Sequence, residues 1–194
     1  MDKKVIYIVT EDWYFCSHRL AHAKAARGLG YDVAVVTKID NHGDEILAAG
    51  IRVLPLRFLK RSSLNFFREI SAFFEILIIL FREKPNLIHM VAFKPILYSS
   101  LAAMLVGIPA RVSALGGLGF VFSSKKHLAK VLRPFLIIFF RYLFNAKQSH
   151  LILQNQDDLQ LMLKQCGVYK EKISLIPSAG VDLGEFQGSS YPKG

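Results

Sequence analysis

The sequence has few cysteines, no apolar run long enough to cross a bilayer and no secretion signal. Its two cysteines, Cys16 and Cys166, are too few and too far apart for a disulfide framework or a cysteine metal site. The longest uncharged apolar runs, residues 76–81 and 135–140, are far shorter than the roughly 18 residues that span a membrane. The apolar run at residues 5–9 is too short for a signal peptide. These absences favour a protein of the reducing cytoplasm that does not cross the membrane.

Glycine is absent from the segment that follows the first predicted strand. Residues 5–9 are continuously apolar, which is typical of a strand buried on both faces. Residues 10–19 follow without a glycine, whereas a dinucleotide-binding turn needs closely spaced glycines at this place. The sequence therefore argues against an enzyme that uses NAD or FAD.

Acidic residues are absent from residues 84–156, within a chain of formal net charge +10. A surface of one sign attracts anions such as nucleic acid, phosphate-bearing substrates or an anionic membrane. Nucleic acid is disfavoured because no helix–turn–helix, zinc or RNA-binding signature accompanies the charge. A predicted helix at 125–147 mixes aromatic residues with cations and suits an anionic bilayer surface; its membrane-facing candidates are Lys125, Lys126, Lys130 and Arg133. The alternative is a helix half buried in the core whose charges are solvated.

Short apolar runs alternate with helical patterns along the whole chain. Strands are predicted at residues 5–9, 32–37, 51–54, 86–90, 110–114, 151–153 and 173–176, and helices at 17–27, 44–49, 63–81, 95–106, 125–146 and 157–165. This alternation predicts an α/β fold, a Rossmann-like doubly wound parallel sheet with helices on both faces. Ligands bind such sheets at the carboxyl ends of the strands, so a site is expected in the loops after Val9, Met90 and Ala114.

Polar residues after the first strand are candidates for binding. Ser17, His18 and Arg19 are predicted to open a helix, where backbone N–H groups and the helix dipole favour an anion. Arg19 can grip a phosphate through two donors, and Glu11 and Asp12 can orient a hydroxyl group or act as a base. The alternatives are that Ser17 is only a helix cap, Arg19 a surface residue and both acids solvated loop residues.

Further candidates follow the fourth and fifth strands. Gly116, Gly117 and Gly119 lie in a loop whose backbone can approach a ligand closely and present N–H donors. Lys94 stands where the next helix begins, so its charge would add to an anion site. His89, inside the fourth strand, is interpreted as a hydrogen-bonded core histidine.

Four segments, in this order and spacing, resemble one enzyme family. They are Glu11-Asp12-Trp13-Tyr14-Phe15 through Ser17-His18-Arg19, then Leu87-Ile88-His89-Met90 with Lys94, then residues 116–122, and then residues 176–182 with Phe186. Together they resemble the amino-terminal domain of family-4 glycosyltransferases of the GT-B fold, in particular bacterial enzymes that extend undecaprenyl-diphosphate-linked sugars. The resemblance covers essentially all of the chain.

The resemblance implies a division of labour between two domains. Residues 1–180 correspond to the acceptor-binding domain and residues 181–194 to the start of the interdomain linker, while the donor domain is absent from the chain. The implied reaction transfers a sugar from a nucleotide-sugar, UDP-linked, with retention at the anomeric carbon. No metal and no bound cofactor are expected, and this part of the enzyme alone is expected to be inactive.

The resemblance also suggests roles for the candidate residues. We expect Glu11, Asp12 and His18 to hold sugar hydroxyls of a lipid-diphosphate-sugar acceptor. The diphosphate contacts are expected from Ser17, Arg19, Lys94 and the backbone of residues 116–119. No catalytic residue is assigned, because Val91 stands where many family members carry a histidine near the reacting sugar. The protein would work as a peripheral protein on the cytoplasmic face of the plasma membrane.

Two other functions stay open on the sequence. One is a non-catalytic membrane subunit that recruits a separate donor-binding partner, which a stop codon after Gly194 would support. The other is a different cleft enzyme on the same fold, such as a sugar-nucleotide epimerase, which binding of free sugar nucleotide by this chain would support.

Overall fold

One sheet of seven parallel strands organises the molecule, in the order β3-β2-β1-β4-β5-β6-β7. The computed structural model describes residues 3–60, 65–117 and 127–177, and only the backbone of residues 127–132. The strands are β1 Lys4–Glu11, β2 Asp32–Lys38, β3 Arg52–Pro55, β4 Leu87–Val91, β5 Ala110–Leu115, β6 Ser149–Leu153 and β7 Ile173–Leu175. All six neighbouring pairs are parallel, as the alternating pattern predicted.

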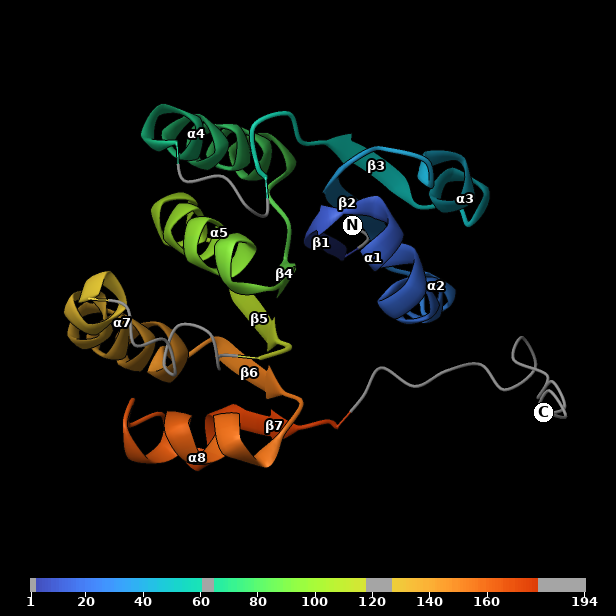
Figure 1. Cartoon of the computed structure of the whole chain (residues 1–194). Helices are drawn as coiled ribbons and strands as arrows, with labels where there is room; N and C mark the ends of the chain where they lie inside the picture. Colours follow the sequence, from blue (N-terminus) through green and yellow to red (C-terminus); the bar gives the residue numbers. More distant parts are fainter. Residues whose placement is uncertain (1–2, 61–64, 118–126, 178–194) are drawn as a thin grey trace, which may run out of the picture.

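Helices cover both faces of this sheet (Figure 1). The helices are α1 Asp12–His18, α2 Leu20–Gly28, α3 Gly43–Ala48, α4 Phe66–Glu83, α5 Phe93–Val106, α7 His127–Asn145 and α8 Gln156–Lys164, with a short 3-10 helix η1 at Lys170–Lys172. On one face α1, α2 and α3 bury Phe15, Leu20 and Ile46 against β1 and β2. On the other, α4, α5, α7 and α8 pack in a second apolar cluster that includes Ile76 and Phe140. The doubly wound α/β fold is confirmed.

The order of the strands creates a crevice beside β1. From β1 the chain runs outward through β2 to β3 and then crosses to the other side of β1, where β4 begins the second half of the sheet. The loops after β1 and β4 therefore leave the carboxyl edge in opposite directions. A gap between such loops is where open α/β sheets bind ligands.

The first helix begins earlier than the sequence pattern predicted. A single helix at 17–27 was expected, whereas α1 starts at Asp12 and ends at His18, and α2 starts at Leu20. The helices meet at Arg19, whose φ of −133° departs from the helical value. The Asp12 carboxylate accepts the N–H of Trp13 at 2.8 Å and thereby satisfies one donor of the first turn. That early start places Ser17 and His18 at the carboxyl end of a helix.

Candidate functional site

A pocket of about 310 Å³ opens at the carboxyl ends of β1, β4, β5 and β6. It is lined by Val9, Thr10, Glu11, Tyr14, Val91, Ala92, Phe93, Leu115, Gly116, Gly117 and Gln154. The three loops named by the sequence pattern, after the first, fourth and fifth strands, therefore meet in one place. A larger hollow of about 530 Å³ lies near the carboxyl end of α2, around Arg27 and Asp32, away from these loops.

The amino end of α5 faces the pocket and carries a strained residue. Ala92, the residue before the helix, has φ 73° and ψ 164°, a conformation that residues with a side chain rarely adopt. Its N–H donates to the Ala114 carbonyl at 3.1 Å, and its carbonyl accepts the N–H of Ile96, so β5 and the helix hold it from both sides. This turn brings Phe93, the first helical residue, to the pocket wall. The positive end of the helix dipole there favours an anionic group.

The glycine loop forms the opposite wall. A Cβ built on Gly116 would approach Gln154 Oε1 to 3.2 Å and the Tyr14 hydroxyl to 4.0 Å, so a larger residue would intrude between these two polar groups. Gly117 has φ 155°, a backbone conformation that favours glycine. The loop thus presents backbone, rather than side chain, to whatever occupies the pocket.

Glu11 at the end of β1 and Tyr14 of α1 complete the pocket wall, and Ser17 and His18 lie behind Tyr14 in contact with it or with each other. Glu11 is half-buried, and its Oε2 accepts the indole N–H of Trp13 at 2.9 Å, which leaves further acceptor capacity on the carboxylate. Tyr14 stacks on His18, with ring centroids 4.2 Å apart and planes 5° apart. The Nδ1 of His18 lies 2.7 Å from the Ser17 hydroxyl. These contacts orient the Tyr14 ring, whose edge reaches the pocket.

Arg19 is a buried cation that forms no ion pair within the described parts of the chain. It is 7% exposed, its Nη1 donates to the His18 carbonyl at 2.8 Å, and its Nε has no hydrogen-bond partner. Burial lowers the pKa of Arg19, and the neighbouring Tyr14 and Tyr7 partly offset that effect. Arg19 is not among the residues that line the pocket, so its charge acts on an anion bound there only through its electric field.

His89 lies beside Arg19 and differs from what the sequence pattern indicated. Its ring stacks on Tyr7 of the adjacent strand with the ring centroids 5.1 Å apart, and its buried Nε2 has no hydrogen-bond partner among the described residues. The interpretation of a hydrogen-bonded core histidine is therefore wrong for this nitrogen. Burial lowers the pKa of His89 to about 3, and the nearby Arg19 and His22 act in the same direction. The ring is neutral at physiological pH.

Asp12 does not face the pocket, contrary to its predicted part in holding a hydroxyl group. Its side chain is fully buried and accepts three backbone N–H groups, those of Trp13 at 2.8 Å, Asp40 at 2.7 Å and His42 at 2.9 Å. Burial alone would raise the pKa of Asp12, but these three donors together lower it. The carboxylate is a structural tie between α1 and the loop that follows β2.

Lys94 and Ser17 are also placed differently from their predicted positions. The Nζ of Lys94 bonds to Glu69 Oε1 at 2.7 Å and to the Lys60 carbonyl at 3.0 Å, and the residue does not line the pocket. Ser17 was expected to open a helix, but its hydroxyl donates to the Trp13 carbonyl one turn earlier, in the last turn of α1. Neither residue therefore offers the anion contact that the sequence suggested, because Lys94 is bonded to Glu69 of α4 and Ser17 to the backbone of α1.

The remaining candidates lie partly outside the described residues. Gly119, Lys125 and Lys126 fall there, and of Lys130 only the backbone is described, within α7. Arg133 is half-buried on the same helix, which continues through Pro134. Within the described residues, no cluster of three His, Cys, Asp or Glu side chains could hold a metal ion, and no helix is long and apolar enough to span a membrane.

Tyr14, Ala92 and Gln154 are among the pocket residues that were given no role from the sequence. Gln154 follows directly after a strand, so the same rule that selected the other loops would have found it. Ala92 follows β4 in the same way, and Tyr14 stands in the segment after β1, but the positive φ of Ala92 and the helix start at Asp12 are not visible in the residue types.

The sequence profile described as "Glycosyl transferase 4-like" matches residues 4–156, which include every element that lines the pocket. The chain belongs to this glycosyltransferase family. A relative in Campylobacter jejuni, named N,N'-diacetylbacillosaminyl-diphospho-undecaprenol alpha-1,3-N-acetylgalactosaminyltransferase, is 27% identical over 169 residues, 87% of this chain and 44% of that protein. An Escherichia coli relative, named UDP-Gal:alpha-D-GlcNAc-diphosphoundecaprenol alpha-1,3-galactosyltransferase, is 27% identical over 157 residues, 80% and 38% of the two chains. The chain thus spans less than half the length of these relatives.

Solved structures share the fold of this chain, at a sequence identity lower than that of the two relatives. A glycosyltransferase from Rickettsia africae superposes with a TM-score of 0.61 at 14% identity, over 90% of this chain and 42% of that one. A UDP-N-acetylglucosamine 2-epimerase from Rickettsia bellii superposes with a TM-score of 0.62 at 16% identity, over 92% and 46%. At such identities the likeness concerns the fold alone.

Proposed function

We propose that this chain is the acceptor-binding part of a retaining glycosyltransferase, which transfers a sugar from a UDP-linked nucleotide-sugar to a lipid-diphosphate-linked sugar. The pocket at the carboxyl edge carries the proposal, since a family-4 chain presents there a carboxylate, a glycine-loop backbone and the amino end of a helix. The names of both relatives specify a sugar on a diphosphate-linked undecaprenol, which supports this class of acceptor.

Within the pocket, the two ends of such an acceptor would meet different chemistry. The Glu11 carboxylate is suited to accept hydrogen bonds from sugar hydroxyls, and His18 would act by holding the Tyr14 ring in place. The amino end of α5 and the backbone around Gly117 are suited to phosphate oxygens. Buried Arg19, whose charge interacts with Tyr14, would add a positive field near the pocket.

The proposed catalytic contribution of this half is positioning. Holding an acceptor hydroxyl in line with a sugar donor lowers the barrier because translational and rotational freedom is already lost on binding. The donor would bind to the part of the protein that the relatives carry beyond the matched length, and residues 181–194 would lead to it. Neither a metal nor a bound cofactor is part of the proposal. The natural location is peripheral, on the cytoplasmic face of the membrane that holds the acceptor.

Binding of a short-chain polyprenyl-diphosphate sugar to this chain, measured by calorimetry, tests the proposal. Arg19→Gln should raise the dissociation constant at least about tenfold, which corresponds to roughly 1.4 kcal/mol. The matched control is Arg27→Gln, because Arg27 is an exposed arginine away from the pocket. Gly116→Val, which places a side chain between Gln154 and Tyr14, should abolish binding. No binding by the unmodified chain, or equal binding by both arginine variants, would contradict the assignment.

A sugar-nucleotide cleft enzyme on the same fold, such as an epimerase, is the alternative function to test. The same titration distinguishes the two functions when it is repeated with free UDP-N-acetylglucosamine. Binding of the free sugar nucleotide, without binding of the lipid-diphosphate sugar, would favour the epimerase-like function. The opposite pattern supports the acceptor domain.

A further inference from the structure

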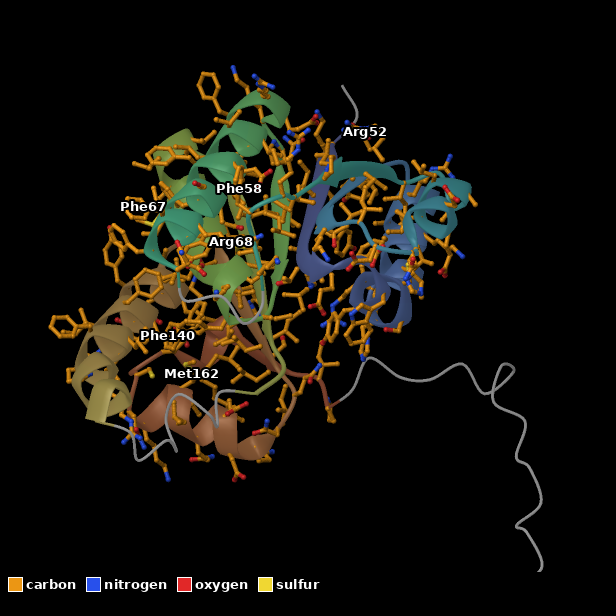
Figure 2. The ribbon with its side chains drawn as sticks, turned by 45° about the horizontal axis from the view of Figure 1, so that its top comes forward. Arg52, Phe58, Phe67, Arg68, Phe140 and Met162 are labelled. Atoms are coloured by element: carbon orange, nitrogen blue, oxygen red, sulfur yellow. The ribbon has the colours of Figure 1, made fainter. Side chains whose placement is uncertain are left out.

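Helix α4 exposes a continuous apolar stripe on the side that faces away from the sheet. From Phe67 onward its members recur every three or four residues, and Phe66 stands beside the first of them, so they share one broad side of the helix: Phe66, Phe67, Ile70, Phe74, Ile78 and Phe81. Phe67 is 78% exposed, and in Figure 2 its ring points away from the ribbon into solvent. The inward side of the same helix is already buried through Ala72, Ile76 and Leu80. The helix is therefore apolar on two sides, and the core accounts for only one of them.

The two neighbouring helices also expose apolar side chains. In Figure 1, α4, α5 and α7 lie next to one another on the same face of the sheet. Exposed apolar residues on α5 and α7 are Leu101, Met104, Leu105, Phe135, Ile138 and Tyr142. These residues and the stripe on α4 are together called the outer helical face. An apolar surface that extends over three helices is more than the scattered exposed residues of an ordinary surface.

Acidic side chains are kept away from this face. Glu69 pairs with Lys94 and Tyr98, Glu75 accepts the backbone N–H groups of Arg57 and Phe58, and Glu83 pairs with Lys4 and Arg52. These three are the acids of α4, and the sequences of α5 and α7 contain none.

Cations, by contrast, border the outer helical face. Arg82 is exposed in the last turn of α4, and the Lys84 ammonium lies 5.8 Å from the centre of the Phe81 ring. Together with the missing acids, these cations give the face an apolar centre and a positive margin.

We infer that the outer helical face docks on an anionic lipid bilayer, with its aromatic side chains in the interfacial region. Aromatic residues combined with cations are what such a surface binds. A second copy of the chain fits less well, because two such faces would bring like charges together with no acid to pair them. The inference rests on the proposed function in one respect: a lipid-linked acceptor is the reason to expect a membrane as the partner of this face.

The position of the face suits an acceptor that is anchored in a membrane. Helices α4, α5 and α7 all begin at the carboxyl edge of the sheet, since each follows a strand that ends there. Phe93, the first residue of α5, lines the pocket. The outer helical face reaches this edge through Phe66 and Phe67 in the first turn of α4, so a bilayer against it would lie at the edge of the sheet where the pocket opens.

Co-sedimentation of the 194-residue chain with vesicles of phosphatidylglycerol and phosphatidylcholine tests the inference. Phe67→Ser/Phe74→Ser should lower the vesicle partition coefficient at least about tenfold, since it removes two large apolar side chains from the contact. The matched control is Leu29→Ser/Leu47→Ser, which removes two exposed leucines, one directly after α2 and one on α3, on the other face of the sheet. This control should bind as the unmodified chain does, and phosphatidylcholine alone should bind all of them more weakly.

A spectroscopic variant covers the case in which the serine variants fold poorly. In a Trp13→Phe background the chain has no other tryptophan, so Phe67→Trp reports on one position of α4. Its emission should shift to the blue when vesicles are added.

Three outcomes would overturn the inference: no vesicle binding by the unmodified chain, equal binding by both double variants, or no shift of the Phe67→Trp emission. If the unmodified chain is a dimer in ultracentrifugation and Phe67→Ser/Phe74→Ser is a monomer that still binds vesicles equally well, the face would be assigned to self-association. The vesicles contain no lipid-diphosphate sugar and the acceptor titration uses no vesicles, so each proposal can fail without the other.

Discussion

Removing the Asp12 carboxylate should destabilise the fold although the residue touches no ligand. Asp12→Ala leaves three backbone donors, at Trp13, Asp40 and His42, without the acceptor that they share. Each hydrogen bond to a charged acceptor contributes roughly 1.5–3 kcal/mol, and relief from burying the carboxylate offsets part of that sum. We expect a net loss of about 3 kcal/mol in the free energy of unfolding. Asp12→Asn, which keeps one acceptor oxygen, should lose about 2 kcal/mol.

Urea unfolding followed by circular dichroism measures these losses, with Asp40→Asn as the matched control. The Asp40 carboxylate is 45% exposed and pairs with Lys38 at the surface, so its removal should change stability by less than about 0.5 kcal/mol. The amide of His42 should also exchange faster with solvent in Asp12→Ala. A loss below about 1 kcal/mol in Asp12→Ala, or an equal loss in the control, would refute the structural role.

The pH dependence provides a second check on Asp12. Because the pKa of Asp12 is lowered in the folded state, the unfolded chain binds the proton first as the pH falls. The stabilisation is fully present above the ordinary pKa of about 3.9 and is lost as the pH falls through the folded value. The unmodified chain should therefore lose stability more steeply than Asp12→Ala below about pH 4.

Two further predictions concern the neighbourhood of the pocket. Ala92→Gly should raise the free energy of unfolding by about 1 kcal/mol, because glycine adopts φ 73° without strain and the greater entropy of the unfolded glycine chain offsets only part of that gain. An unchanged urea midpoint would contradict the idea that Ala92 is strained. His89→Phe should flatten the loss of stability between about pH 6.5 and pH 3: the depressed pKa of His89 means that the unfolded state takes up the proton in this window and the folded state does not. Parallel stability curves for the unmodified chain and the variant would count against it.

Local patterns in the sequence were enough for the elements and the fold class. Continuous apolar runs such as the one in β1 and the alternation with amphipathic segments depend only on which residues follow each other, so all seven strands were located to within a few residues. The carboxyl-edge rule then selected the loops that carry Glu11, Gly116 and Gly117, which do meet in the pocket. The charge pattern between residues 84 and 156 was likewise visible without a structure.

Tertiary structure decided which of the polar residues are available to a ligand. Asp12 and Lys94 stood in the expected loops, yet long-range contacts with the chain after β2 and with Glu69 of α4 take up both side chains. Arg19 shows the reverse, since its sequence neighbours do not reveal that it is buried with no carboxylate partner in the part of the chain that the structure describes. Residue types determine the repeating pattern of a strand or helix, but a side chain's partners come from segments far away in sequence. Only the packed fold brings those segments together.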